Sequence, residues 1–466
     1  MSALTGKTLL VLGLGESGLA MARWAALRGA RLRVTDSRTL PPGLDALQAE
    51  APLAEILLGE QGKEVLDGVD LVAISPGLDP RVGLAAEARR RGLSVVGEMD
   101  LLAQALDELD VRAQTKILAI TGTNGKTTTT ALAAALATAA GFDAVAAGNI
   151  SPAALDVLMD RLEVGASLPE CWVLELSSFQ LETLGRLQPD AAVVLNVSDD
   201  HLDRYAGVDE YAATKAAIFA GDGVQVLNRD DVRVEAMARA GRRVVRFGQG
   251  APVAGDDYGI TARDGEDWLV RGGQALLPLA ALPLAGRHNA ANALAALALC
   301  ETGLGVAPQR LLDALKAFRG LPHRVELVAE RADGVQFYDD SKGTNVGATV
   351  AALDGFARPV VLIAGGDGKG QDFSPLRPAL AHKARALMLF GRDAPRIDAA
   401  VSGCGVEIER VADLDAAVLR ANAHARSGDV VLLSPACASL DMFRNYAHRA
   451  EVFVAAVRRL PEVSAR

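Results

Sequence analysis

Three segments of the chain repeat one order of elements, and this order limits the fold more than any other feature of the sequence. In each segment a short apolar, β-rich run leads into a glycine-containing loop, and a helical pattern follows. The apolar runs are residues 8–12, 117–120 and 359–364. A strand, a loop and a helix in this order form the repeating unit of a parallel sheet. We therefore expect an α/β fold with three such domains.

The length of the chain supports the same number. A chain of 466 residues predicts about three domains at roughly 100–200 residues each. Polar stretches near residues 107–115 and 320–322 interrupt the periodic segments, so we place the domains at 1–105, 106–320 and 321–466. Residues 248–273 are rich in Gly and Asp with short alternating runs, and we expect an antiparallel excursion there.

Charge and composition exclude several classes of protein. The net charge is −10, so a general attraction to nucleic acid or to an anionic membrane is not expected. The four cysteines are far apart in the sequence, which argues against a disulfide framework or a zinc site. No apolar run reaches the ~20 residues of a membrane span, and the first apolar run is too short for a signal peptide. We expect a soluble, cytoplasmic enzyme with no membrane insertion.

The strongest local signal is the segment TGTNGKTT, residues 121–128, between an apolar run and a helix. Its glycines let backbone N–H groups surround phosphates, and the helix N-terminus adds positive charge. Lys126 can reach a terminal phosphate, and the Thr127 hydroxyl can bind Mg²⁺. The segment therefore predicts a nucleotide site formed by Gly122, Thr123, Asn124, Gly125, Lys126, Thr127 and Thr128.

Bound Mg²⁺ needs further oxygen ligands, which open α/β sheets supply from the carboxyl ends of neighbouring strands. Glu175 follows one apolar run, and the stretch that contains His201 follows the next. Together they predict a metal pocket. Lys215 lies in a helical pattern and by itself indicates only a surface lysine. Asn292 opens an apolar helix, where it could be a helix cap or a nucleotide contact.

A second glycine motif, GLGESG at residues 13–18, is followed by Asp36 after the next apolar run. This is a fair match to a dinucleotide fingerprint, but the glycine pattern is weak by itself. The first domain could bind NAD or a uridine or adenine nucleotide.

Further segments complete an ordered set of motifs. They are SPG at 75–77, GNI at 148–150, LELSSFQL at 174–181, DDHLDRY at 199–205, GRHNAANALAAL at 286–297, GLPHRVE at 320–326, DDSKGTN at 339–345, GGDGKG at 365–370 and SPACASLDMF at 434–443. With the two glycine motifs, this set resembles the Mur ligases of peptidoglycan synthesis, most closely the MurD family, over nearly the whole chain. The resemblance implies an N-terminal Rossmann-like domain, a central P-loop-type ATPase domain and a C-terminal Rossmann-like domain.

The resemblance also implies a reaction. Members of the family use ATP to phosphorylate the carboxylate of UDP-N-acetylmuramoyl-L-alanine, and the amino group of D-glutamate attacks the acyl phosphate. The implied catalytic residues are Lys126, Glu175, His201 and Lys215. Thr127 and Glu175 would hold one Mg²⁺, and His201 would hold a second with Lys215, which is carbamylated in the family. A carbamate can bind a cation, whereas an ammonium cannot.

The remaining implied contacts fall into three groups. ATP would also touch Asn292, Arg324 and Asp340. The uridine nucleotide substrate would lie on Glu16, Ser17, Asp36, Ser37, Arg38 and Gly77, with Asn149 near its muramoyl part. Glutamate would be held by Thr344, Lys369, Ser439, Leu440 and Tyr446. We expect a monomer that acts on small molecules. The alternatives are another Mur-type or folylpolyglutamate-type amide ligase, an NAD-dependent dehydrogenase, and a non-catalytic nucleotide-binding regulator.

Overall fold

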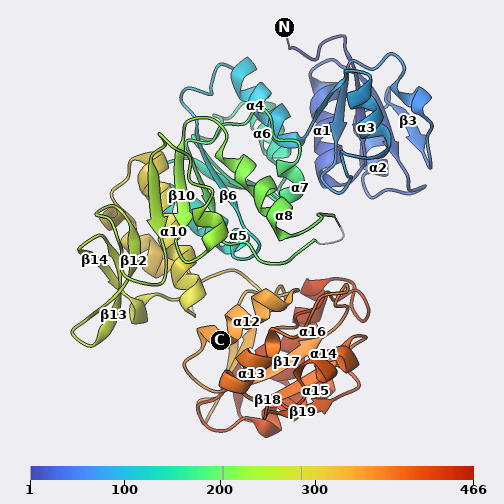
Figure 1. Cartoon of the computed structure of the whole chain (residues 1–466). Helices are drawn as coiled ribbons and strands as arrows, with labels where there is room; N and C mark the ends of the chain where they lie inside the picture. Colours follow the sequence, from blue (N-terminus) through green and yellow to red (C-terminus); the bar gives the residue numbers. More distant parts are fainter. Residues whose placement is uncertain (1, 202–203, 285, 466) are drawn as a thin grey trace. The chain divides into compact units, whose positions relative to one another are not determined.

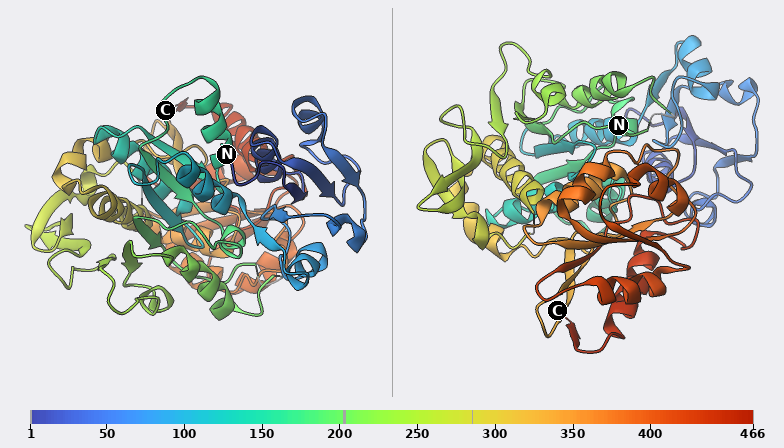
Figure 2. Two further views of the ribbon diagram at one scale, coloured as in Figure 1. Left: turned by 90° about the horizontal axis from the view of Figure 1, so that it is seen from above. Right: turned by 60° about the horizontal axis from the view of Figure 1, so that its bottom comes forward.

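A computed structural model describes residues 2–201, 204–284 and 286–465. Contacts within the chain divide it into two compact units (Figures 1 and 2). The first comprises residues 1–260, 270–276 and 293–315, and the second comprises residues 261–269, 277–292 and 316–466. Each unit is described separately below.

The first sheet of the first unit has five parallel strands in the order β3-β2-β1-β4-β5. This is the order of the first five strands of a Rossmann fold without its sixth strand. The strands are β1 (Thr8–Leu12), β2 (Arg31–Asp36), β3 (Glu55–Leu58), β4 (Leu71–Ile74) and β5 (Ser94–Val96), and the helices between them are α1 (Glu16–Leu27), α2 (Leu44–Glu50) and α3 (Gly83–Arg90).

The second sheet of this unit has six parallel strands in the order β11-β10-β9-β6-β8-β7. The strands are β6 (Lys116–Thr121), β7 (Ala144–Gly148), β8 (Cys171–Glu175), β9 (Ala191–Val194), β10 (Val224–Asn228) and β11 (Val244–Phe247), and the helices are α5 (Lys126–Ala139), α6 (Ala154–Glu163), α7 (Ser178–Leu181), α8 (Val208–Lys215) and α9 (Val232–Glu235). Strand β6 lies between β8 and β9, so the phosphate loop leaves the middle of the sheet.

Helix α4 (Glu98–Glu108) follows the first sheet and leads into the second. It packs on α1 and on α6, and Figure 1 shows it beside α6. Its buried leucines join a core cluster that also contains residues of both sheets. The predicted boundary near residue 105 therefore falls within a helix that packs on α1 and on α6.

The predicted excursion forms a three-stranded sheet of β12 (Tyr258–Arg263), β13 (Glu266–Arg271) and β14 (Gln274–Pro278). It begins later and ends later than residues 248–273. The early part of that range is rich in Gly and Asp and forms turns. Helix α10 (Arg287–Leu304) and helix α11 (Leu312–Ala317) follow the small sheet.

The sheet of the second unit has seven strands in the order β19-β18-β17-β20-β16-β15-β21. The first five are parallel, and β15 pairs antiparallel with β16 and β21. Its strands are β15 (Glu326–Arg331), β16 (Gln336–Asp339), β17 (Val360–Gly365), β18 (Ala384–Phe390), β19 (Glu407–Arg410), β20 (Val430–Leu433) and β21 (Val463–Ala465), and its helices are α12 (Val346–Gly355), α13 (Leu376–Lys383), α14 (Ala394–Val401), α15 (Leu414–His424) and α16 (Tyr446–Arg458). Two core clusters lie on opposite faces of the sheet.

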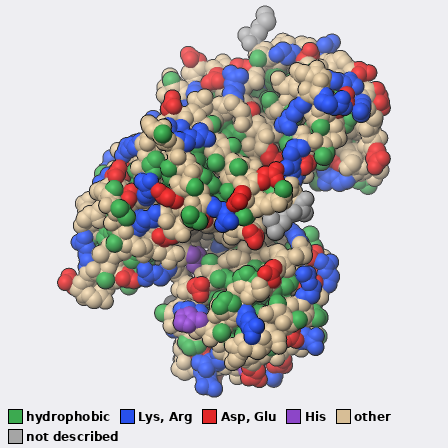
Figure 3. All heavy atoms as spheres, in the orientation of Figure 1, with side chains coloured by type: hydrophobic (Ala, Val, Ile, Leu, Met, Phe, Trp, Pro, Cys, Tyr) green, Lys and Arg blue, Asp and Glu red, His purple; other side chains and the backbone are tan. Residues whose placement is uncertain are grey.

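The three large sheets confirm the α/β prediction. Their central strands are continuous apolar runs such as VVLIA in β17 and VVLL in β20, and these strands are buried, as expected where helices cover both faces of a parallel sheet. No helix among the described residues is long and apolar enough to span a membrane. On the face drawn in Figure 3, positive and negative side chains are interspersed. All four cysteines are unpaired, and three of them are buried.

Candidate active site

The loop between β6 and α5 has the backbone of a phosphate-binding loop. Gly122 and Gly125 have φ angles of 155° and 85°, a region that favours glycine. A Cβ on Gly122 would lie 2.9 Å from the Cβ of Leu195. Gly125 precedes the 14-residue helix α5, and no side chain caps that helix. The loop therefore presents the N-terminus of a long helix to an anion.

The loop is fixed from the end of the neighbouring strand β9. The backbone N–H of Asn124 donates to Oδ1 of Asn196 at 2.8 Å, and Nδ2 of Asn196 donates to the carbonyl of Asn124 at 3.0 Å. Thr123 donates its backbone N–H to the carbonyl of Asn196, and its hydroxyl accepts from the backbone N–H of Ser198. Asn196 was not predicted, although its place directly after a buried strand could have indicated it.

Glu175 lies at the carboxyl end of β8, as predicted, and is 2% exposed. Nδ2 of Asn149 donates to its Oε1 at 2.8 Å, and the backbone N–H of Asn149 donates to its carbonyl. Gly148 has a φ of 107°, and a Cβ there would collide with the Glu175 carbonyl. The GNI segment therefore orients Glu175, a contact that the sequence did not reveal.

The second carboxylate oxygen of Glu175, Oε2, is buried and has no hydrogen-bond partner. Leaving a buried carboxylate oxygen without a donor is costly unless another group binds it. A divalent cation is such a group, and carboxylate and hydroxyl oxygens are the ligands that Mg²⁺ prefers. Thr127 is the second residue of α5. The residues present thus fit the predicted Mg²⁺ site.

Two lysines converge on the same loop. Nζ of Lys126 donates to the carbonyls of Gly122 and Thr123 at 2.9 Å each. Nζ of Lys215 donates to the Gly122 carbonyl at 3.0 Å and lies 4.4 Å from the ring centroid of Tyr211. Lys126 is held on the loop and does not extend into solvent.

The local sequence indicated a surface lysine at position 215, and this interpretation is wrong. Lys215 is the last residue of α8, and it is only 1% exposed. Burial, together with the nearby charge of Lys126, holds the pKa of its amine well below its usual value. A buried amine of this kind is neutral at a lower pH than a surface lysine.

His201 lies on the loop after β9 with its side chain 41% exposed. Its ring centroid is 4.6 Å from that of Phe179 and 6.3 Å from that of Tyr211. Tyr211 also contacts Lys215, so the predicted second pair of metal ligands shares one aromatic neighbour. Leu202 and Asp203, in the same motif, lie outside the described residues.

A cavity of about 630 Å³ opens at the first sheet, within the usual range for a small-molecule site. All six residues predicted to contact the nucleotide part of the substrate line it, namely Glu16, Ser17, Asp36, Ser37, Arg38 and Gly77. Asn149 forms a hydrogen bond with Glu175 and does not line this cavity. The cavity adjoins the N-terminus of α1, which no side chain caps.

Asp36 connects two parts of the cavity wall through hydrogen bonds. Its Oδ2 accepts from the backbone N–H of Leu14 at 2.8 Å and from the Arg38 guanidinium at 2.6 Å. The hydrogen bonds from Arg38 lower the pKa of Asp36 to about 2. Asp36 thus secures the glycine loop and the cation beside it.

In the second unit, the residues predicted to bind glutamate lie on loops at the carboxyl ends of the adjacent strands β17, β20 and β16, where open α/β sheets bind their ligands. Lys369 follows β17, Ser439 and Leu440 follow β20, and Thr344 follows β16. Tyr446 begins α16, and Nζ of Lys342 lies 5.1 Å from its ring centroid. A β-bridge between Asp367 and Ala438 joins the first two loops.

Arg449 was not predicted. It is fully buried, and its hydrogen bonds connect these loops. Its guanidinium donates to the hydroxyl and the carbonyl of Ser341 and to the carbonyl of Cys437. The Ser341 hydroxyl in turn donates to the carbonyl of Tyr446. Burial lowers the pKa of Arg449 to about 10. Helical spacing alone gave no signal for this residue.

Of the predicted ATP contacts of the second unit, Asn292 and Asp340 are buried and Arg324 is half-buried. Nδ2 of Asn292 donates to Oδ1 of Asn289 at 3.1 Å inside α10, so Asn292 is not a helix cap. Asp340 accepts from the Ser434 hydroxyl at 2.7 Å. Burial raises the pKa of Asp340 to about 7, and the charge of Arg324 opposes this rise. Arg324 and Asp340 are therefore electrostatic neighbours.

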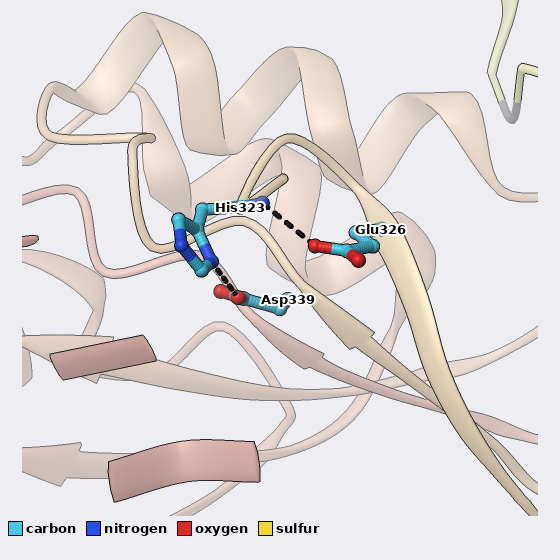
Figure 4. A group of neighbouring side chains, drawn as sticks. All are labelled: His323, Glu326 and Asp339. Atoms are coloured by element: carbon cyan, nitrogen blue, oxygen red, sulfur yellow. Dashed lines mark hydrogen bonds and ion pairs between the residues drawn. The ribbon is translucent and has the colours of Figure 1, made fainter. Parts of the chain in front are cut away.

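Figure 4 shows the one group of three His, Cys, Asp or Glu side chains that could share a cation among the described residues, namely His323, Glu326 and Asp339. Nδ1 of His323 lies 2.7 Å from Oδ2 of Asp339, and the backbone N–H of His323 donates to Glu326 at 2.9 Å. These two contacts join the residues before and at the start of β15 to the end of β16.

Three family models match the chain. The Mur ligase MurD-like N-terminal domain matches residues 7–97, the Mur ligase middle domain matches 120–300, and the Mur ligase glutamate ligase domain matches 323–437. The chain is 77% identical over 465 residues to the UDP-N-acetylmuramoylalanine--D-glutamate ligase of Aromatoleum aromaticum, with 100% of both chains covered. It is 54% identical to the enzyme of the same name from Nitrosospira multiformis, covering 98% of this chain and 96% of the relative.

Solved structures share the fold at low identity. MurF from Acinetobacter baumannii has a TM-score of 0.60 at 17% identity, covering 97% of this chain and 91% of that chain. UDP-N-acetylmuramate-alanine ligase MurC from Thermotoga maritima has a TM-score of 0.58 at 20% identity, covering 97% and 99%. With the matched domains, the sheet orders and the phosphate loop beside Glu175, these findings show that the chain belongs to the Mur ligase family of ATP-dependent C–N ligases.

Proposed function

We propose that this chain joins D-glutamate to UDP-N-acetylmuramoyl-L-alanine. The alanyl carboxylate would attack the γ-phosphorus of ATP, release ADP and form an acyl phosphate. The amino group of glutamate would then attack the acyl carbon, lose a proton and expel phosphate. The observation that carries the proposal is the phosphate loop beside a buried carboxylate with one unpartnered oxygen. The names of the relatives support the choice of substrates.

Two residues of the loop and three residues outside it have roles in this proposal. The ammonium of Lys126 leaves the two loop carbonyls and neutralises the γ-phosphate. Thr127 and Glu175 would hold one Mg²⁺, and His201 with a carbamylated Lys215 would hold a second. Bound Mg²⁺ supplies positive charge that offsets the charge developing on the transferred phosphoryl group.

The burial of Lys215 favours its modification. Only a neutral amine attacks CO₂, and burial holds the pKa of Lys215 well below its usual value. The amine adds to CO₂ and loses a proton, and the resulting carbamate carries a negative charge that is attracted to the nearby Lys126, an attraction that the neutral amine lacks. Carbamylation would therefore convert Lys215, a buried amine whose protonated form is disfavoured, into a metal ligand.

Substrate recognition would be divided between the two units. The uridine diphosphate would occupy the 630 Å³ cavity, where the uncapped N-terminus of α1 faces an anion. Glutamate has two carboxylates, and Lys369 with the donors of the β16, β17 and β20 loops would bind them. We further propose that the enzyme acts as a monomer in the cytoplasm, where it meets ATP and the nucleotide-linked precursor.

A substrate panel tests this function. Purified protein is incubated with ATP, Mg²⁺, UDP-N-acetylmuramoyl-L-alanine and one of D-glutamate, L-glutamate, L-alanine, a diamino acid or D-Ala-D-Ala, and phosphate release is followed. We expect release with D-glutamate and none with the Lys126→Ala variant. Absence of release with D-glutamate contradicts the proposal, and release with another amino acid identifies a sister activity. A rise in NADH fluorescence on titration would instead support a dehydrogenase.

A further inference from the structure

Glu98 is a buried carboxylate outside the residues described above as the active site. It is the first residue of α4 and is 2% exposed. Its Oε1 accepts from the backbone N–H of Leu155 at 3.2 Å, and the carboxylate also accepts from the backbone N–H of Ala154 and from the Ser17 hydroxyl. Ser17 lies at the start of α1, which follows a strand of the first sheet, and Ala154 and Leu155 lie at the start of α6, which follows a strand of the second sheet.

The two helix starts belong to functional loops. Ser17 lies in the glycine loop that lines the nucleotide cavity. The loop before α6 begins with Asn149, which orients Glu175. A second bridge joins the same two loops, because the Ser151 hydroxyl donates to Oε1 of Glu16 at 2.6 Å. Glu98 thus lies where the nucleotide loop meets the loop that supports the metal ligand.

Glu98 also borders the nucleotide cavity indirectly. It lines a small cavity of about 10 Å³. Ile74, Ser75, Pro76 and Leu78 line both this small cavity and the large one. A shift of the Glu98 side chain would therefore reach the wall on which the uridine nucleotide would lie through these shared residues.

The electrostatic surroundings of Glu98 are unusual for a buried carboxylate. Its Oε2 has no hydrogen-bond partner, and no lysine or arginine forms an ion pair with it among the described residues. The nearby charge of Asp156 is also negative, and Asp156 itself pairs with Arg23 at 3.3 Å. Glu16 and Asp100 add two further carboxylates nearby. Burial raises the pKa of Glu98 to about 7.

We propose that Glu98 is a positioning residue that holds Ser17 and the start of α6 in register, so that the two ends of the nucleotide-linked substrate are bound together. This inference rests on the proposed function, because it assumes that the cavity takes the uridine nucleotide. Glu98 acts through Ser17 and the α6 backbone and touches no reacting atom. Its charged form accepts these hydrogen bonds more strongly than the neutral acid does.

The test uses Glu98→Gln and Glu98→Ala in the full-length enzyme. Glu98→Ala removes all the contacts, and we expect the KM for UDP-N-acetylmuramoyl-L-alanine to rise about tenfold, the effect of losing one hydrogen bond to a charged group. The KM values for ATP and glutamate should stay within about twofold. Glu87→Gln is the matched control, since Glu87 is also buried but pairs with Arg90 and Arg91 inside the first domain.

A pH series separates positioning from simple structural support. In the wild type, Glu98 becomes charged as pH rises through about 7, and a charged carboxylate accepts its positioning hydrogen bonds more strongly than the neutral acid, so the KM for the nucleotide substrate should fall across this range. Glu98→Gln has no charge to gain, and its KM should stay flat. A double-mutant cycle of Ser17→Ala with Glu98→Gln should show strong coupling in the same KM, because one residue acts through the other.

The outcomes are distinct. If the wild type releases no phosphate, the proposed function fails and the inference with it. If the wild type is active but Glu98→Gln reproduces its KM–pH curve and the cycle is additive, only the inference is overturned. If Glu98→Ala does not fold, the glutamine variant and the cycle still decide between these results.

Discussion

Replacing Lys215 by methionine should stabilise the protein while it abolishes catalysis. Lys215 is 1% exposed, and burial and the charge of Lys126 disfavour its protonated form. Methionine has a similar length and no charge to desolvate, so the change relieves this penalty. It also removes the group that would become a metal ligand, so phosphate release should be lost.

The size of the stabilisation should depend on pH in a defined direction. The folded-state pKa of Lys215 is lowered, so between that pKa and the usual value of 10.5 the unfolded state binds one proton more than the folded state. The wild type therefore gains stability as pH rises through this window, by about 1.4 kcal/mol per pH unit. Lys215→Met lacks this slope, so its advantage should shrink by the same amount per unit.

Urea unfolding in CO₂-depleted buffer at half-unit steps from pH 7 to 10 measures this difference. Hydrogen exchange in peptides that cover β6 and β8 reports on the domain that contains Lys215. Lys7→Met, at an exposed position, is the control and should leave the pH dependence unchanged. An advantage of Lys215→Met that stays constant across the whole series would refute the idea that the amine is buried in its neutral form.

Three further changes have predicted outcomes. Gly148→Ala should cost at least about 2 kcal/mol of unfolding free energy in a urea titration and abolish phosphate release, because its Cβ collides with the Glu175 carbonyl at a positive φ. Arg449→Met should leave the Ser341 carbonyl without its donor, lower stability by about 2–4 kcal/mol and raise the KM for glutamate. Asp36→Asn should remove about 1–2 kcal/mol of stability at pH 7. The wild type loses this contribution as pH falls from about 4 towards the lowered pKa of about 2, so the two proteins should converge in acid unfolding curves.

The sequence predicted those parts of the molecule that depend on neighbouring residues. Buried parallel strands are continuous apolar runs, and the predicted run 8–12 coincides with β1 while 117–120 falls one residue inside each end of β6. The phosphate loop and Glu175 followed from spacing, because a glycine loop after a strand and an acidic residue at the next strand end have few other uses.

Contacts between distant segments were not predictable. Asn149 and Glu175 are 26 positions apart and meet only because β7 and β8 are adjacent. Lys215 has the local pattern of a surface lysine, and its burial depends on how α8 packs above the phosphate loop. Arg449 lies on a helix whose spacing shows nothing unusual, and its three acceptors lie on loops after β16 and β20. The resemblance supplied the role of Lys215 but none of these contacts.

Under the proposed function, the unpartnered oxygen of Glu175 would make the substrate complex part of what keeps the central domain folded. The folded chain alone leaves that buried oxygen without a partner, and a metal–nucleotide complex that binds only the folded state would supply one. At a concentration 100 times its dissociation constant, such a complex adds about 2.7 kcal/mol to the unfolding free energy. Resistance of this enzyme to heat and to proteolysis should therefore track the energy charge of the cell, with the protein most vulnerable when ATP is scarce.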